Sequence, residues 1–271
     1  MARLIFDGSH LRAVLHPGST GLLMVTFDYR RDGKADFSAD AHSTGFARIG
    51  HAQLSIKTKA NDWFINPDTR ALEPVLAALA GQFDRVQMLG FSMGAYAAFR
   101  FAAALRARSV LAVSPQVSID PELAPHERRY PAEAARFDPV LGDLGPVASP
   151  GLGGLILLDP FIAADLAHAR ALQVLFPAVR LVRLGFGGHP AFDIIRHSGQ
   201  SWTLHREAMA LHPDPGLIRA AHRAGRGRVP AYWQRLGAWR SGRRRPGHDL
   251  GHDLGHDLGG EFGVDGAGES P

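Results

Sequence analysis

Val86-Gln87-Met88-Leu89-Gly90-Phe91-Ser92-Met93-Gly94-Ala95-Tyr96 is the stretch that decides the fold of this 271-residue chain. An apolar run typical of a strand leads into the pentapeptide at 90–94, and an alanine-rich run typical of a helix follows directly. A strand, a sharp turn that carries serine and a helix together form a nucleophile elbow. The two glycines remove the Cβ atoms that would collide where strand and helix come close. We therefore expect the Ser92 hydroxyl to stand above a sheet, over a helix N-terminus that favours negative charge.

The pentapeptide alone does not establish this interpretation, because G-x-S-x-G also arises by chance in chains rich in glycine and serine. The alternative is a tight turn between strand and helix whose serine only caps the helix. Chemical partners that follow in the right order along the chain decide between the two interpretations.

Composition favours a globular protein of enzyme size. Hydrophobic residues make up 45% of the chain, which is ample for a core, and the length allows one large α/β domain or two small ones. The sequence has no cysteine, which excludes disulfides, thiol nucleophiles and cysteine metal sites. No apolar run is long enough for a signal peptide or a membrane span. We therefore expect a cytoplasmic protein that does not cross a membrane.

The net charge of +4 is unevenly distributed. Residues 201–246 hold ten arginines against two acids, about +8, and residues 247–271 hold six acids and no base, about −6, which leaves about +2 for residues 1–200. An Arg-rich segment that also carries Tyr232, Trp233 and Trp239 is one way to bind nucleic acid. Because no nucleic-acid motif accompanies it, we predict a solvated helical extension and no nucleic-acid partner.

Eight runs are typical of strands, at residues 3–6, 11–16, 22–28, 52–58, 86–91, 109–114, 155–159 and 179–184. The run at 22–28 is continuously apolar, as in a strand buried on both faces, and the run at 52–58 alternates. Helical patterns separate the later strands, with a start signal at 66–68 and further helices at 93–106 and 165–176. Strands that alternate with helices predict an α/β fold with a mostly parallel sheet covered by helices.

Three segments depart from this alternation. Residues 29–45 are polar and look like a loop, and residues 116–153 are too long and irregular for a simple connection, so we predict an insertion over one end of the sheet. Beyond residue 200, short helices are expected at 201–211, 216–224 and 230–239. The chain is therefore divided into a domain at 1–200, a basic helical extension at 201–240 and a disordered low-complexity tail at 241–271.

The tail contains a tandem repeat, Gly-His-Asp-Leu at 247–250, 251–254 and 255–258. A spacing of four would align His248, His252 and His256 on a helix as metal ligands. A glycine in every repeat costs such a helix about 1 kcal/mol each relative to alanine. We therefore predict a low-complexity expansion and no metal site.

Taken together, these residues resemble the α/β-hydrolase superfamily, as in serine esterases and lipases, over about residues 1–200. In that family the nucleophile follows the fifth strand, the acid the seventh and the histidine the eighth. By the strand count above, Ser92 follows the fifth strand, Asp159 the seventh and His189 the eighth. The resemblance implies an eight-stranded α/β-hydrolase sheet, with residues 116–153 as a short insertion where the family commonly carries a lid.

A serine nucleophile requires such partners. Serine is a poor nucleophile at neutral pH, so a neutral imidazole must take its proton, and a carboxylate on the far ring nitrogen fixes the tautomer and stabilises the imidazolium. His189 ends the glycine-rich stretch 185–188, which can aim its ring inward; a surface loop histidine is the alternative. Four other histidines look solvent-facing or capping: His126, His168, His197 and His205.

Two carboxylates compete for the role of the acid. Asp159 ends its strand directly, which matches the family's usual geometry. Asp165 lies six residues later, where capping of a helix N-terminus explains it fully. We therefore prefer Asp159, whose alternative role is that of a turn carboxylate before Pro160.

The resemblance also implies an oxyanion hole with two donors. The first is the N–H of Met93, directly after the nucleophile. The second comes from the loop after the third strand, near Phe27, Asp28 or Tyr29. The sequence departs from the family here, because no His-Gly or Gly-Gly pair follows that strand. The Asp28 carboxylate would also oppose a developing negative charge unless it points away.

The sequence thus predicts a serine hydrolase that acts on a small-molecule ester or related acyl bond and requires no cofactor or metal. One alternative is acyl transfer to an acceptor other than water. Another is a catalytically weak member of the fold that serves as a binding or scaffold protein, and a third is nucleic-acid binding through residues 201–246.

Overall fold

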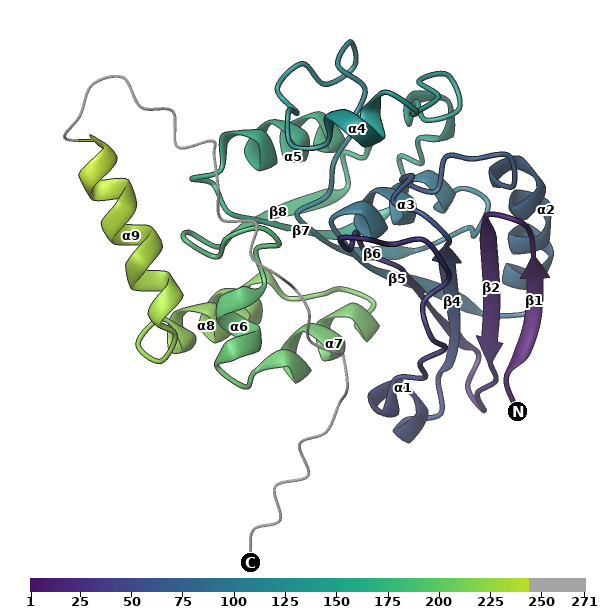
Figure 1. The fold of residues 1–271 in the computed structure, drawn as a ribbon. Helices are drawn as coiled ribbons and strands as arrows, with labels where there is room; N and C mark the ends of the chain where they lie inside the picture. Colours follow the sequence, from purple (N-terminus) through teal and green to yellow (C-terminus); the bar gives the residue numbers. More distant parts are fainter. Residues whose placement is uncertain (244–271) are drawn as a thin grey trace, which may run out of the picture.

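A sheet of eight strands forms the centre of the computed structural model, which describes residues 1–243 (Figure 1). Its order is β1-β2-β4-β3-β5-β6-β7-β8. β2 pairs antiparallel with β1 and β4, and all other neighbours are parallel. The strands are β1 (Arg3–Asp7), β2 (Leu11–His16), β3 (Leu22–Phe27), β4 (Ala52–Thr58), β5 (Arg85–Phe91), β6 (Ser109–Val113), β7 (Gly153–Leu158) and β8 (Val179–Arg183).

The central strands are apolar at successive positions because both of their faces are buried. In β6, Val110 and Ala112 pack into the apolar core on one side of the sheet, and Leu111 and Val113 pack into the core on the other side. Side chains of a strand point alternately to the two faces, so a continuous apolar run is what a doubly covered sheet requires.

Helices supply the second layer of both cores (Figure 1). On one face lie α2 (Thr69–Ala80), α3 (Met93–Phe101) and α5 (Ala163–Leu175). On the other face lie α1 (Thr44–Arg48), α6 (Asp193–His197), α7 (Ser201–Met209) and α8 (Pro215–Gly225). The last described helix, α9 (Pro230–Arg243), stands beyond the β8 end of the sheet.

The predicted eight-stranded, mostly parallel sheet is confirmed, and each predicted strand lies within two residues of an observed one. The helix predicted at 93–106 ends earlier, at Phe101, and continues as turns to Arg106, which has a positive φ of 47°. Sequence patterns did not indicate α1 and α6. Each has only five residues, too few for an apolar period of 3.6 to appear.

The segment between β6 and β7 is mostly irregular, as predicted, with the short helix α4 (Pro131–Ala134) and a 3-10 turn at Gly145–Val147. Two side chains of α3 hold it down. The Tyr96 hydroxyl donates to the Gly142 carbonyl at 2.7 Å, and Arg100 Nε donates to the Leu141 carbonyl at 3.1 Å. This segment therefore lies over the helix that begins at the elbow.

The helices after residue 200 pack directly on the rest of the molecule. Leu204 and Ala208 of α7 and Ile218 and Ala221 of α8 belong to the same core as strands β5 to β8. Whether 201–240 is a unit distinct from 1–200 stays a prediction. Of the predicted tail, 241–243 fall in α9, and 244–271, with the Gly-His-Asp-Leu repeat, lie outside the described residues.

Candidate active site

The elbow has the strained geometry that its sequence predicts. Ser92 has φ 47° and ψ −117°, a conformation rare for a residue with a side chain, and its N–H donates to the Val113 carbonyl of β6 at 2.8 Å. A Cβ at Gly90 would lie 2.4 Å from the Gly94 carbonyl oxygen, and one at Gly94 would lie 2.5 Å from the Asp28 carbonyl oxygen. Both positions must be glycine for α3 to approach the sheet this closely.

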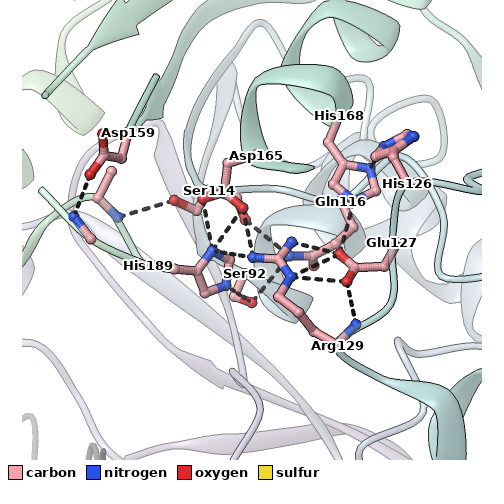
Figure 2. A network of polar contacts seen from close by, with 12 residues as sticks. Ser92, Ser114, Gln116, His126, Glu127, Arg129, Asp159, Asp165, His168 and His189 are labelled. Carbon is pink, nitrogen blue, oxygen red and sulfur yellow. Dashed lines mark hydrogen bonds and ion pairs between the residues drawn. The ribbon is translucent and has the colours of Figure 1, made fainter. Parts of the chain in front are cut away.

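Ser92 meets His189 at the carboxyl edge of the sheet (Figure 2). Ser92 Oγ lies 2.9 Å from His189 Nε2. The serine is 7% exposed and the histidine side chain 19% exposed, so the pair is largely shielded but reachable. The two residues expected to act together thus come from the turn after β5 and from the loop after β8.

The carboxylate that binds His189 is Asp165, and the preference for Asp159 is wrong on this point (Figure 2). Asp165 Oδ2 and Oδ1 lie 2.8 and 3.1 Å from His189 Nδ1. Asp165 is the third residue of α5, and its side chain points at the imidazole rather than capping the helix. With Nδ1–H donating to Asp165, Nε2 is left as the acceptor of the Ser92 hydroxyl proton.

Asp159 has a different task, close to its alternative role as a turn carboxylate. Its Oδ1 accepts the N–H groups of Phe161 and Phe186, at 3.0 and 3.1 Å, and its Oδ2 accepts the N–H of Gly188 at 3.0 Å. Burial raises the pKa of Asp159, and these three N–H groups oppose the rise. The carboxylate therefore joins the turn after β7 to the loop that carries His189.

Asp165 is completely buried and has, besides His189, a cationic neighbour, Arg129, from the segment between β6 and β7. Arg129 Nη1 donates to Asp165 Oδ1 at 2.8 Å. Burial acts to raise the pKa of Asp165, but His189 and Arg129 outweigh it and hold that pKa below its usual value. Arg129 Nη1 also lies 3.2 Å from His189 Nδ1. Because both nitrogens carry hydrogen in this tautomer, that approach is a contact and not a hydrogen bond.

Arg129 is in turn held by Glu127. Their side chains join through Arg129 Nε at 2.9 Å and Nη2 at 2.5 Å, and the Arg129 N–H also donates to Glu127. The Glu127 carboxylate is buried, which alone would raise its pKa, but hydrogen bonds from His168 and Arg129 lower it well below its usual range. Glu127 thus balances the charge that Arg129 brings to Asp165.

His168 continues this network away from the nucleophile and is fully buried, so its expected solvent-facing position is wrong. The Val117 N–H donates to His168 Nδ1 at 3.2 Å, and His168 Nε2 lies 2.9 Å from Glu127. An accepting Nδ1 places the proton on Nε2, where it points to the carboxylate. His126 also reaches His168 Nδ1, at 3.1 Å.

Gln116 and Tyr130 lie against the Ser92–His189 pair, and Trp63 contacts both of them. Gln116 Nε2 lies 3.4 Å from Ser92 Oγ, and the Tyr130 hydroxyl lies 3.3 Å from His189 Nε2. The indole N–H of Trp63 donates to Gln116 Oε1 at 3.1 Å, which fixes the orientation of that amide. Trp63 also packs against Tyr130, with ring centroids 4.7 Å apart. Gln116 and Tyr130 belong to the segment between β6 and β7, in the place predicted for a lid.

The structure bears on two of the expected oxyanion donors, Met93 and Asp28. Met93 begins α3 directly after Ser92, as required. The Asp28 N–H donates to the Ile56 carbonyl at 3.1 Å, so this N–H is not the second donor. The Asp28 carboxylate accepts hydrogen bonds from Lys34 Nζ at 3.0 Å and Ser38 Oγ at 2.8 Å, and the Lys34 ammonium balances its charge. Phe27 and Tyr29 stay predictions for this role.

Within residues 1–243 we find no group of three or more His, Asp or Glu side chains that could hold a metal ion. In the same part of the chain, no helix has the length and apolarity needed to cross a membrane.

The candidate site contains a serine, an imidazole and a carboxylate that are hydrogen-bonded in line. That set can move a proton from the serine hydroxyl while the oxygen attacks an electrophilic carbon.

The strand order, with the serine after β5 and the histidine after β8, is that of the α/β-hydrolase fold predicted from the sequence. No protein-family model and no curated protein matches the chain. Several solved structures are similar to it in fold. One is Est1E from Butyrivibrio proteoclasticus with ferulic acid bound, which is 16% identical, with 75% of this chain and 98% of that chain covered and a TM-score of 0.48.

Two further solved structures are similar in fold at comparable identity. An α/β serine hydrolase without lid from Xanthomonas campestris is 16% identical, with 84% of this chain and 94% of that chain covered and a TM-score of 0.40. A capsule O-acetyltransferase of Neisseria meningitidis serogroup A is 12% identical, with 66% and 85% covered and a TM-score of 0.47.

Proposed function

We propose that this protein is a serine hydrolase that cleaves an ester or related acyl bond through Ser92, His189 and Asp165. The single observation that carries the proposal is the continuous chain of hydrogen bonds from Ser92 Oγ to His189 Nε2 and from His189 Nδ1 to the buried carboxylate of Asp165. A turn serine that only caps a helix has no need of these two partners, and Ser92 makes no side-chain cap to α3.

The proposed reaction begins when Ser92 Oγ attacks the acyl carbon and His189 Nε2 takes the hydroxyl proton. Asp165 stabilises the imidazolium, and the Met93 N–H, with a second donor from Phe27 or Tyr29, holds the oxyanion. His189 then gives its proton to the leaving alcohol, and an acyl-enzyme remains on Ser92. A water molecule then attacks the acyl carbon while His189 takes its proton. Ser92 Oγ receives that proton as the acid leaves. Acyl transfer to another acceptor would differ only in this second half.

Labelling with a fluorescent fluorophosphonate tests the proposal, because this probe reacts with an activated serine. We expect the native protein to be labelled, and Ser92→Ala and His189→Ala to abolish labelling. Ser149→Ala, in the segment between β6 and β7, is the matched control and keeps it. A native protein with an intact fold that takes no label contradicts the proposal, and labelling that survives Ser92→Ala assigns the reactive serine elsewhere.

A screen of activated esters then follows on the same variants. Release of the alcohol in an initial burst, equal in amount to the enzyme, would identify the acyl-enzyme. A catalytically weak scaffold protein would give neither the burst nor the label.

A further inference from the structure

The loop that carries His189 has a backbone that other elements must hold in place. Between β8 and α6, Phe186 has φ 60° and Gly188 has φ 81°. A positive φ at a residue with a side chain persists only where the surroundings determine it. Within the loop, Gly187 N–H finds a local partner, the Leu184 carbonyl at 2.9 Å. The other polar groups of residues 185–188 that the structure pairs are bound by side chains from elsewhere.

On the N–H side of the loop, the partner is Asp159, which accepts from Phe186 and Gly188. On the carbonyl side, the partners come from the two helices that end the described chain. His222 Nε2 of α8 donates to the Gly185 carbonyl at 3.1 Å. Arg235 Nη1 of α9 donates to the Gly187 carbonyl at 2.9 Å and approaches the Phe186 carbonyl at 3.3 Å.

Arg235 is itself held in place by another side chain, and its guanidinium lies against Gly188, the residue before His189. Its Nη2 donates to Asp193 at 2.7 Å, at the start of α6. A Cβ at Gly188 would lie 2.5 Å from the guanidinium carbon of Arg235. The absence of a side chain at 188 therefore lets the planar guanidinium lie against the loop backbone.

Aromatic packing supports the same contact. The Phe186 ring stacks on Phe161 with centroids 4.2 Å apart, and it meets Tyr232 and Trp239 of α9 edge-on, at 5.7 and 5.8 Å. The helix that looked like a solvated basic extension thus places one arginine and two aromatic rings against the loop of His189.

We propose that Arg235 is a positioning residue, which, with His222 and Asp159, holds the loop 185–188 from both sides and so aims His189 at Ser92. Arg235 acts through the loop backbone and touches no reacting atom. The inference rests on the proposed function, in which the Ser92–His189 distance decides the rate. A misplacement of about 1 Å at a reacting group can cost about 100-fold in rate.

The test compares Arg235→Met with Arg240→Met, an exposed arginine of the same helix. The full chain is used throughout. Hydrogen–deuterium exchange of the peptide 184–190 is measured together with the fluorophosphonate labelling rate, resolved into affinity and maximal rate. We expect Arg235→Met to speed exchange in 184–190 about 10-fold or more and to lower the maximal labelling rate about 10- to 100-fold, with little change in affinity. Arg235→Lys, which keeps a cationic donor, should restore part of both, and Arg240→Met should match the native protein.

Exchange that stays at the native level in 184–190, or that rises over the whole chain, overturns the inference. So does a loosened loop that leaves the labelling rate unchanged. Failure of the proposed function is a separate result, because then the native protein takes no label while the exchange comparison between Arg235→Met and Arg240→Met still decides whether Arg235 orders the loop.

Discussion

Acidification below about pH 6.5 should destabilise this protein through His222. The residue is 1% exposed, its Nε2 donates to the Gly185 carbonyl, and its Nδ1 is buried without a hydrogen-bond partner in the described part of the chain. Burial lowers the pKa of His222 to about 4; the Gly185 carbonyl opposes this shift and Arg226 adds to it. Between about pH 6.5 and 4, His222 is therefore protonated in the unfolded chain but stays neutral in the folded protein.

The sign and size follow from that difference. An unfolded histidine titrates near 6.5, so the stabilisation is complete above pH 6.5 and is lost as the pH falls from 6.5 towards 4. Each pH unit in this interval is worth about 1.4 kcal/mol. The loss therefore amounts to about 2.5 kcal/mol at pH 4.5 and about 3 kcal/mol at still lower pH.

Urea denaturation of the native protein and His222→Gln at pH 7.5 and 4.5 isolates this contribution. Glutamine keeps an N–H donor for the Gly185 carbonyl but does not titrate. Acidic groups such as Asp165 and Glu127 titrate in both proteins, so their effects cancel in the comparison. We expect the free energy of unfolding to fall by about 2.5 kcal/mol more in the native protein than in the variant. Equal falls in the two proteins would refute the reasoning.

Three further substitutions test the site. Asp165→Asn should slow fluorophosphonate labelling by about 10³- to 10⁴-fold, whereas Asp143→Asn on an exposed turn should not; equal rates for the two variants count against Asp165. Gly94→Ala should lower the free energy of unfolding in urea by about 1–3 kcal/mol, because the new Cβ meets the Asp28 carbonyl, and unaltered stability contradicts this. Arg129→Met should make the free energy of unfolding fall less on acidification from neutral pH to about pH 3 than it does in the native protein, because burial of Asp165 is then less offset and its pKa rises towards or above the unfolded value; equal falls in urea denaturation rule this out.

The fold could be predicted because its signals are local and repeated. Apolar runs mark the parallel strands, and the turn at Ser92 leaves its mark in two glycines whose missing Cβ atoms are a direct steric requirement. The position of His189 after the last strand was also accessible, since it depends only on counting strands.

The acid was not accessible in the same way. Both Asp159 and Asp165 follow β7, and distance along the chain does not show which one faces the imidazole. One signal favoured the observed arrangement, because Asp followed by Pro160 is a turn-forming pair, and Asp159 indeed accepts the Phe161 N–H two residues on. Asp165, three positions into α5, could be explained as a cap, which hid its role.

Residues of the segment between β6 and β7 were missed for another reason. Gln116, Glu127, Arg129 and Tyr130 reach the site through an irregular chain path that has no periodicity. Five titratable residues in a row at 126–130 were the only visible sign. The contacts of Arg129 with Asp165 and of Tyr130 with His189 depend on the tertiary structure alone.

The closeness of Arg129 and Tyr130 in the chain has one more consequence. The first supplies a counter-charge to Asp165, and the second stands over His189. A large ligand that displaces residues 129–130 would expose Ser92 and, in the same movement, remove the Arg129 counter-charge from the Asp165 carboxylate. By thermodynamic reciprocity, binding of this ligand and protonation of Asp165 would then favour each other.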